Sequence, residues 1–254
     1  MKTLGLISVL VTGALLIFAV EDFPDWGAVD SPANSGEMAT YFVEETASDT
    51  AVPNMVTAVL ADYRGYDTMF ETVVIFTAGI AILALLRSTK EDPIEAPVQP
   101  SRAEVSDSQR IIIGTTCRLL TPIIQLFALY VIAHGHYSPG GGFQGGVIFG
   151  ASFILLAVAY DLPTALKRLP ERRYLFLAAF GIIFYAAFGI ASMALGANFL
   201  DYSILYKIFP TDPIYARSHS MLGVEIGVAF TVTTIMFATY ANLSSGGKLG
   251  SRGL

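Results

Sequence analysis

A stretch of 27 residues, from position 174 to position 200, contains no charged side chain. About 20 apolar residues in a helix cross the hydrocarbon core of a bilayer, which is about 30 Å thick, so this stretch predicts a transmembrane helix. Charged residues make up 14% of the whole chain, against roughly 25% in soluble proteins. We therefore predict an all-α, multi-pass membrane protein. Its six predicted transmembrane helices are residues 4–20, 68–86, 111–133, 142–160, 174–195 and 216–240.

The first predicted span has an alternative interpretation as a cleaved signal peptide. Lys2 is the only charge before the apolar run and would form its basic n-region. However, no convincing cleavage site of the A-x-A kind precedes Glu21. We expect the segment to be retained as a membrane span.

Lysine and arginine are distributed unevenly over the predicted loops. With the N-terminus inside, eleven basic residues lie in cytoplasmic segments and three, Arg64, Lys207 and Arg217, lie in external ones. Short loops rich in Lys and Arg stay on the cytoplasmic side of the membrane. The expected topology is therefore N-in/C-in, with two spans followed by four.

The polar segments divide the chain into parts. Residues 21–52 carry eight acidic side chains and no basic one, which predicts either a solvated, partly irregular external loop or a mouth that concentrates cations. Residues 88–110 contain three prolines and mixed charges, which predicts a cytoplasmic linker. The linker would join a two-span unit, residues 1–87, to a four-span unit, residues 111–243, and residues 244–254 would form a flexible tail.

The start of the second span contains a predicted helix break. Asp49 or Thr50 would cap a short helix that has Pro53 in its first turn and runs to about Tyr63. Gly65 is the expected break, and the membrane helix would follow it.

Charged residues cluster beside that break, in the sequence "ADYRGYDTMFE". Asp67 and Glu71 are four residues apart and share one helix face, and Arg64 could neutralise one of the two carboxylates. The cluster is either an interfacial group of ion pairs that fixes the span in depth or a broken-helix site for cations or protons. Glu71 would be its deepest member.

Glu225 is an ionisable residue near the middle of the last span. It follows Ala216 by nine residues, or about 14 Å of helix, which is about half of the hydrocarbon core. A carboxylate at that depth must be protonated, paired or hydrated. We expect either a proton or cation relay or a neutral, hydrogen-bonded acid. His219 could be its relay neighbour or only an interfacial histidine.

Other candidate residues favour structural roles. Arg118 lies inside the third span, and Asp161, at the end of the fourth, is a plausible partner for it. Cys117 is the single cysteine, which excludes an intrachain disulfide and a cysteine-based metal site. We expect no cofactor and no catalytic residue, and the net charge of −6 argues against nucleic acid as a partner.

The external turn between the third and fourth spans reads "HGHYSPGGGFQGG". No Gly-Lys-Ser or Gly-Lys-Thr follows it, so it is not a phosphate-binding loop. His134 and His136 lack a third ligand for a metal, but could titrate near neutral pH at the end of a proton path. Glycine recurs every four residues beyond the turn and predicts a face for close helix packing. The predicted packing motif comprises Pro139, Gly140, Gly141, Gly142, Phe143, Gly145, Gly146 and Gly150.

Two of these motifs resemble a known family. The glycine motif, with "RLLTPIIQLFALYVIAHG" before it, resembles the MnhB protein of the Mrp multisubunit Na⁺/H⁺ antiporters. The sequence "DYRGYDTMFETVVIFTAGIAILALL" resembles the C-terminal tail of the largest antiporter protein and a small protein of membrane-bound hydrogenases. The chain thus resembles a fusion of that tail with MnhB. The residues carried by the resemblance are Asp62, Arg64, Gly65, Asp67 and Glu71 in the tail, and His136, Pro139 to Phe143, Gly145 and Gly146 in the MnhB part.

The resemblance implies a partner-rich complex in a bacterial or archaeal inner membrane. Large proton-pump-like subunits and small helical subunits would exchange Na⁺ for H⁺ together with this chain. The alternatives are the equivalent module of a redox-driven complex, such as a membrane-bound hydrogenase, and a purely structural scaffold. A self-contained carrier is disfavoured because the chain lacks an evident internal repeat.

Overall fold

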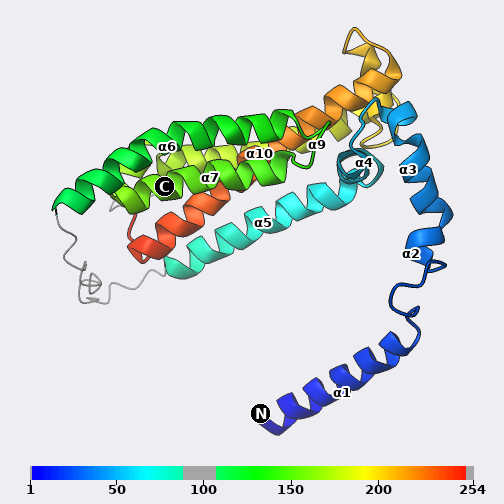
Figure 1. The fold of residues 1–254 in the computed structure, drawn as a ribbon, viewed down its shortest axis with the longest axis horizontal. Coiled ribbons are helices and arrows are strands. Elements are labelled where there is room, and N and C mark those ends of the chain that lie inside the picture. The colour runs from blue at the N-terminus through cyan, green and yellow to red at the C-terminus, as the bar shows by residue number, and fades with distance from the viewer. Residues whose placement is uncertain (1, 88–106, 250–254) are drawn as a thin grey trace. The chain divides into compact units, whose positions relative to one another are not determined.

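The computed structural model describes residues 2–87 and 107–249, which form helices and turns (Figure 1). The chain divides into two compact units, Met1–Glu45 and Thr46–Leu254. Most of the linker expected at residues 88–110 lies outside the described residues, and so does the end of the expected tail.

Unit 1 contains the first predicted span as helix α1 (Lys2–Glu21). Its apolar part, Gly5–Glu21, is shorter than the five spans described below. The acidic segment that follows is more helical than we expected, because it contains α2 (Pro32–Ser35) and α3 (Glu37–Thr50), which continues into unit 2. A proline in the first turn favours α2, and Glu37 in the first turn of α3 complements the helix dipole.

The described residues of unit 2 include five helices that are long and apolar enough to cross a membrane, which confirms five of the six predicted spans. A short helix, α8 (Leu162–Arg168), follows the third of them, and a 3-10 helix (Tyr202–Lys207) precedes the last. The five spans are α5 (Gly65–Leu86), α6 (Asp107–Ala133), α7 (Gly142–Ala159), α9 (Glu171–Ala194) and α10 (Pro213–Ser245).

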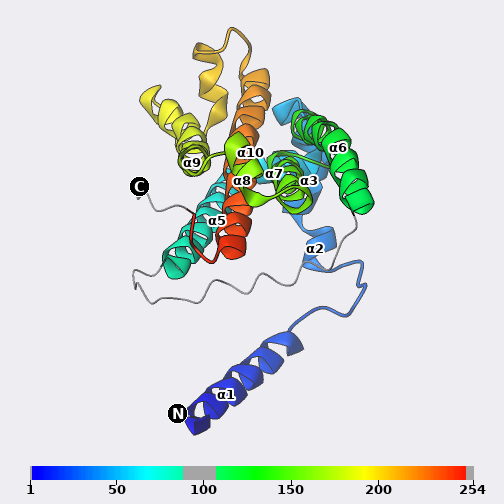
Figure 2. The ribbon, with the colours of Figure 1, turned by 90° about the vertical axis from the view of Figure 1, so that its left-hand side faces the viewer.

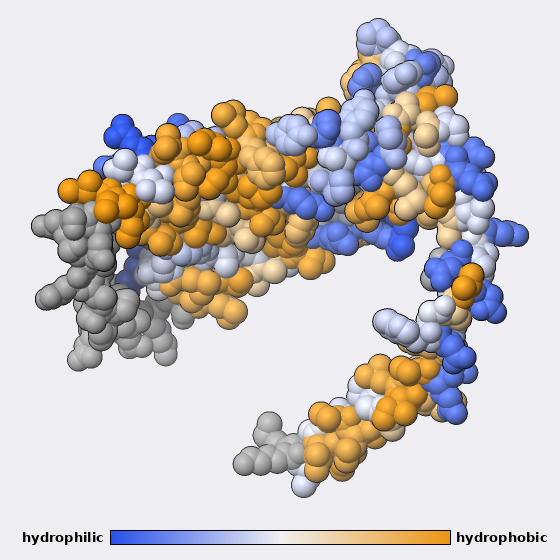
Figure 3. Space-filling model, viewed as in Figure 1, coloured by the Kyte–Doolittle hydropathy of each residue, from blue (hydrophilic) through white to orange (hydrophobic). Residues whose placement is uncertain are grey.

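Helix α10 is the centre of unit 2. It packs against α5, α7 and α9, while α6 packs mainly against α7 (Figures 1 and 2). Within an 18-residue apolar stretch of α10, 67% is buried inside the structure. In the corresponding stretches of the other four spans the buried share is 17–39%. Hydrophobic side chains cover much of the middle of the helices around it (Figure 3). The outer helices therefore present their apolar sides to lipid or to other subunits, and the N-in/C-in orientation stays a prediction.

The helix break before α5 differs in detail from the prediction. Asn54, rather than Asp49 or Thr50, caps the short helix α4 (Met55–Ala58), because its side chain accepts a hydrogen bond from the backbone N–H of Val56. A π-helical turn (Val59–Tyr63) follows, and Arg64 leaves the helical conformation with φ −120° and ψ 34°. The expected break at Gly65 therefore lies one residue earlier, and Gly65 begins α5.

Candidate functional site

A cavity of about 410 Å³ lies where α4, α5 and α10 approach the start of α7. Glu71 of α5 and Glu225 of α10 both line it, so two acids predicted as separate candidates share one cavity. Phe143 and Val228 contribute apolar walls. The polar side chains that line the rest of the cavity are Asn54, Thr57, Thr68, Thr72, Gln144 and Tyr185.

Glu225 is buried against the turn that joins α6 to α7. Its side chain is 9% exposed, and a Cβ atom placed on Gly135 or Gly141 would lie only 3.1 Å or 2.6 Å from one of its carboxylate oxygens. Gly141 also has a φ of +136°, which residues with a side chain rarely adopt. Glu225 Oε2 makes no hydrogen bond to any described residue. A buried carboxylate of this kind is tolerated when it holds a proton or a cation.

Asn54 fastens α4 to the same turn. Its Nδ2 donates hydrogen bonds to the carbonyl oxygens of Gly135 at 2.8 Å and Ser138 at 2.9 Å, and its backbone N–H donates to the carbonyl of His136 at 3.0 Å. The hydroxyl of Thr57 donates to the Gly135 carbonyl at 2.8 Å. The turn that backs Glu225 is therefore held by residues from a distant part of the sequence, which local patterns did not predict.

Glu71 lies on the exposed side of α5, at the edge of the cavity. Arg64, the residue before α5, pairs with Asp67 in the first turn of that helix, and the two side chains are 65% and 47% exposed. The ion pair leaves Glu71, one turn further along, without a basic partner among the described residues. The cluster thus combines an exposed ion pair with an acid that reaches the cavity.

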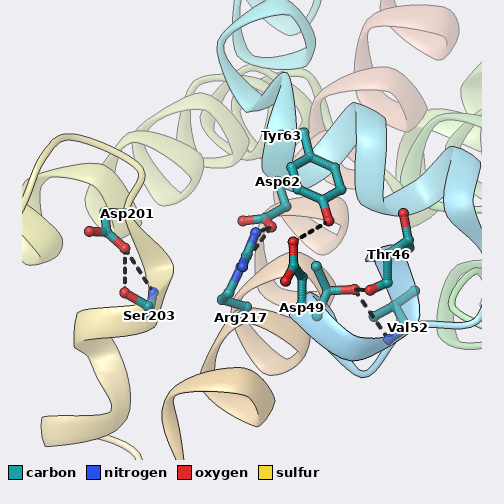
Figure 4. Close-up of polar contacts among 9 residues, drawn as sticks. Thr46, Asp49, Val52, Asp62, Tyr63, Asp201, Ser203 and Arg217 are labelled. Atoms are coloured by element: carbon teal, nitrogen blue, oxygen red, sulfur yellow. Dashed lines mark hydrogen bonds and ion pairs between the residues drawn. The ribbon is translucent and has the colours of Figure 1, made fainter. Parts of the chain in front are cut away.

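Asp62 pairs with Arg217 of α10 rather than with Arg64. Arg217 Nε donates to Asp62 Oδ2 at 2.8 Å and its Nη2 also contacts that oxygen, while the guanidinium lies 5.5 Å from the ring centre of Tyr63 (Figure 4). The Tyr63 hydroxyl in turn donates to Asp49 at 2.9 Å. The sequence offered no sign of this pair, because its members are 155 positions apart and Arg217 was counted only as an external charge.

Burial dominates the electrostatics of this cluster. It raises the pKa of Asp62 above the ordinary 3.8, Arg217 opposes that increase, and the negative charges of Asp201 and Asp49 add to it. Burial and the hydrogen bond to Asp49 raise the pKa of Tyr63 to about 12. Tyr63 therefore stays protonated at neutral pH and acts there as a donor.

His134 and His136 lie in the turn between α6 and α7, and His219 lies near the start of α10. His136 Nδ1 is 3.5 Å from the hydroxyl of Ser218, and burial together with nearby His219 lowers the pKa of His136. The ring of His219 packs edge-on to Phe209 at 6.3 Å. Within the described parts of the chain, no three His, Cys, Asp or Glu side chains are grouped so that they could hold a metal ion.

The glycine motif brings α7 close to its neighbours. A Cβ on Gly142 would meet the backbone of Glu225, one on Gly146 would lie 3.1 Å from Ala229 Cα, and one on Gly150 would lie 2.9 Å from the Thr233 carbonyl. These three glycines therefore form the face that packs against α10. Four other members surround them: Gly145 faces Ile132 of α6, Gly140 approaches Val131, Pro139 lines the cavity and Phe143 remains 44% exposed.

Two further charges, Arg118 and Asp161, were expected to have structural roles. Asp161 accepts a hydrogen bond of 2.6 Å from the backbone N–H of Thr164 and so caps α8, while Arg118 is exposed on α6, and their pairing stays a prediction. At the far end of α5, Arg87 pairs with Glu171 and donates to Asn242 Oδ1 at 3.2 Å. That second cluster was not predicted, because Arg87 follows α5 whereas Glu171 and Asn242 belong to α9 and α10.

Family models match two successive parts of the chain. Residues 112–238, half of the sequence, match a domain described as related to the MnhB subunit of the Na⁺/H⁺ antiporter. The chain belongs to this MnhB-related family. Residues 26–101 match a second family, MbhE, one of the MBH subunits.

Relatives of the MnhB-related chain include subunits of membrane complexes. The B subunit of the Na(+)/H(+) antiporter of Bacillus subtilis (strain 168) is 38% identical over 100 residues, which cover 39% of this chain and 69% of that protein. A chain of the Mrp complex from Dietzia sp. DQ12-45-1b has 25% identity and a TM-score of 0.69, over 99% of this chain and 27% of that one. A chain of the membrane-bound sulfane sulfur reductase, an archaeal respiratory complex, has 25% identity and a TM-score of 0.63, over 95% and 97% of the two chains.

Proposed function

We propose that this chain is an inner-membrane subunit of a multisubunit antiporter that exchanges a monovalent cation, Na⁺, for protons. Membership of the MnhB-related family and similarity to a chain of the Mrp complex support this assignment. The two family matches support a fusion of a two-span unit, residues 1–87, with a four-span unit, residues 111–243. Other membrane subunits are its expected partners.

The observation on which an ion-path role depends is the cavity between Glu71 and Glu225. Na⁺ and H⁺ can compete for one carboxylate, so that binding of either ion at Glu225 releases the other. The hydroxyls of Thr57, Thr68 and Thr72 each donate their hydrogen to a backbone carbonyl, so these oxygens can face a cation only as acceptors. One lone pair of Thr57 already accepts from Asn54 Nδ2 at 3.0 Å. We propose that ions pass between Glu71 and Glu225 through this cavity.

Neutral variants of the two acids test the proposal in the assembled complex. Glu225→Gln and Glu71→Gln should each lower the rate of Na⁺-driven proton movement in membrane vesicles and change its pH profile. Glu171→Gln is the matched control, because Glu171 lies in the ion pair at the other end of α5. Normal assembly together with the wild-type rate and pH profile in both cavity variants would leave only a scaffold role.

A second candidate function is the equivalent module of a redox-driven ion pump. It is supported by the match over nearly the whole length of a chain in the sulfane sulfur reductase and by the match to the MbhE family. Electron transfer would then belong to other subunits, because this chain has a single cysteine. Iron and labile sulfide in the purified native complex would favour this candidate, and a complex without either would favour the antiporter.

A further inference from the structure

A shallow groove lies directly outside the cavity, along α5. Its polar members are Arg64, Asp67 and Glu71, and its apolar members are Phe70, Val74, Ile75 and Phe143. Glu71 and Phe143 line both the cavity and the groove. These two side chains therefore lie at the boundary between the cavity and the groove.

Glu71 is the unbalanced charge of the groove. Arg64 is paired with Asp67, and no described residue forms an ion pair with Glu71. Glu71 follows Gly65, the first residue of α5, by six residues, which is about 9 Å of helix and lies inside the predicted span. Acyl chains offer no hydrogen-bond donor, so a carboxylate that faces them at this depth is costly.

The side chains around Glu71 suit a helix as the covering element. Phe70 and Val74 are four residues apart and form a ridge on α5, and they are 58% and 65% exposed. Asp67 and Glu71 form a parallel ridge one position further round the helix. A helix packs between such rows spaced by four residues, and its side chains can supply the positive charge that lipid lacks.

We propose that a transmembrane helix of a partner protein in the complex lies in this groove and places a lysine or arginine against Glu71. This inference rests on the proposed function, since it makes Glu71 the point where the cavity of this chain meets the next subunit. The partner helix excludes lipid from the cavity that contains Glu225, and its basic side chain balances the Glu71 carboxylate when no cation is bound.

Photo-crosslinking in the native membrane tests the contact. A benzophenone amino acid replaces Phe70 or Val74, and the adducts of the assembled complex are identified by mass spectrometry. Both positions should crosslink to one transmembrane segment of another subunit, with a lysine or arginine within one turn of the attachment point. Ile183 of α9 is the matched control, because it is 66% exposed, similar to Val74, but lies outside the groove. It should give no adduct with that segment.

Adducts only with lipid, with a second copy of this chain or with a segment that lacks a basic residue would overturn the proposal.

A charge exchange tests the electrostatic part of the proposal. Glu71→Lys should cause loss of the partner from the purified complex, and replacing the partner's identified basic residue with glutamate should restore the partner. Failure of that rescue also contradicts the proposal. If the crosslink forms but Glu71→Gln and Glu225→Gln both leave antiport unchanged, the docking surface stands and the ion-path function fails.

Discussion

Asn54 is a single residue with two separable structural roles. Its Oδ1 caps α4 by accepting from Val56 N–H, and its Nδ2 holds the turn behind Glu225 through the carbonyls of Gly135 and Ser138. Ser can replace Asn as a helix cap, but its shorter side chain cannot reach the two carbonyls. Substitutions at this position can therefore separate helix stability from the shape of the cavity.

We predict that Asn54→Ser and Asn54→Ala lower antiport to a similar extent, because both release the turn. Loss of the donor to the Ser138 carbonyl should destabilise the complex by about 1–3 kcal/mol in each variant. The alanine variant should be less stable than the serine variant by about a further 1 kcal/mol, because it also loses the cap. Vesicle transport and the melting temperature of the purified complex measure the two effects. Wild-type transport by Asn54→Ser would show that transport does not depend on the hydrogen bonds from Asn54 Nδ2 to the turn.

His136 makes stability depend on pH at the same turn. Its pKa is lowered from 6.5 by burial and by His219, so the folded protein favours the neutral ring. At a pH below 6.5 the unfolded chain binds a proton at this histidine more readily than the folded protein does. The stability contributed by the neutral ring is therefore lost as the pH falls further below 6.5.

We predict that the melting temperature of the wild-type complex falls as the pH is lowered below about 6.5, where the unfolded chain binds the proton of His136 more readily than the folded protein does. His136→Gln should reduce this fall, because it removes the titrating group. The same substitution at His134, on the same turn, is the control and should keep the wild-type fall. Identical pH dependence in wild type and His136→Gln would contradict the prediction.

At the scale of elements, the contact between α7 and α10 depends on the absence of side chains. We predict that Gly146→Ala destabilises the complex by about 1–3 kcal/mol, the usual cost of overpacking, because its Cβ would lie 3.1 Å from Ala229 Cα and from the Ala229 carbonyl oxygen. Gly114→Ala in α6 is the matched control, because its Cβ would lie 3.6 Å from Tyr160, an ordinary contact. Alanine favours helix over glycine, so the control should be unchanged or slightly more stable. Melting temperature and complex yield measure the difference, and equal effects would refute the packing argument.

The elements that the sequence predicted well are those whose cause is local. Five apolar runs became long helices because length and hydropathy are enough to specify a span. The partners of Asn54, Asp62 and Arg87 lie 81, 155 and 84 positions away in the sequence, and no periodicity encodes such pairs. Thus the two acids of the site could be predicted one by one. The cavity that they share and the hydrogen bonds from Asn54 to the turn could not.

At the scale of the whole molecule, α5 is joined to the later helices at both ends. Asp62, just before α5, pairs with Arg217 of α10, and Arg87, just after it, pairs with Glu171 of α9. The hydroxyl of Tyr185 also donates to the Gly65 carbonyl at 2.9 Å. These contacts connect the MbhE-like part with the MnhB-related part independently of the covalent linker.

We therefore predict that the covalent connection between the two parts is dispensable once the protein has folded. A protease site inserted between residues 88 and 106, where the sequence is rich in proline and charge, should allow cleavage while both fragments continue to co-purify and antiport persists. Asp62→Arg should weaken the association of the cleaved fragments, because it places two cations together where a partly buried pair stood. Adding Arg217→Asp should restore much of it. Dissociation of the cleaved wild-type fragments would show instead that the chain connection, and not the two ion pairs and the packing of α5 on α10, keeps the two parts together.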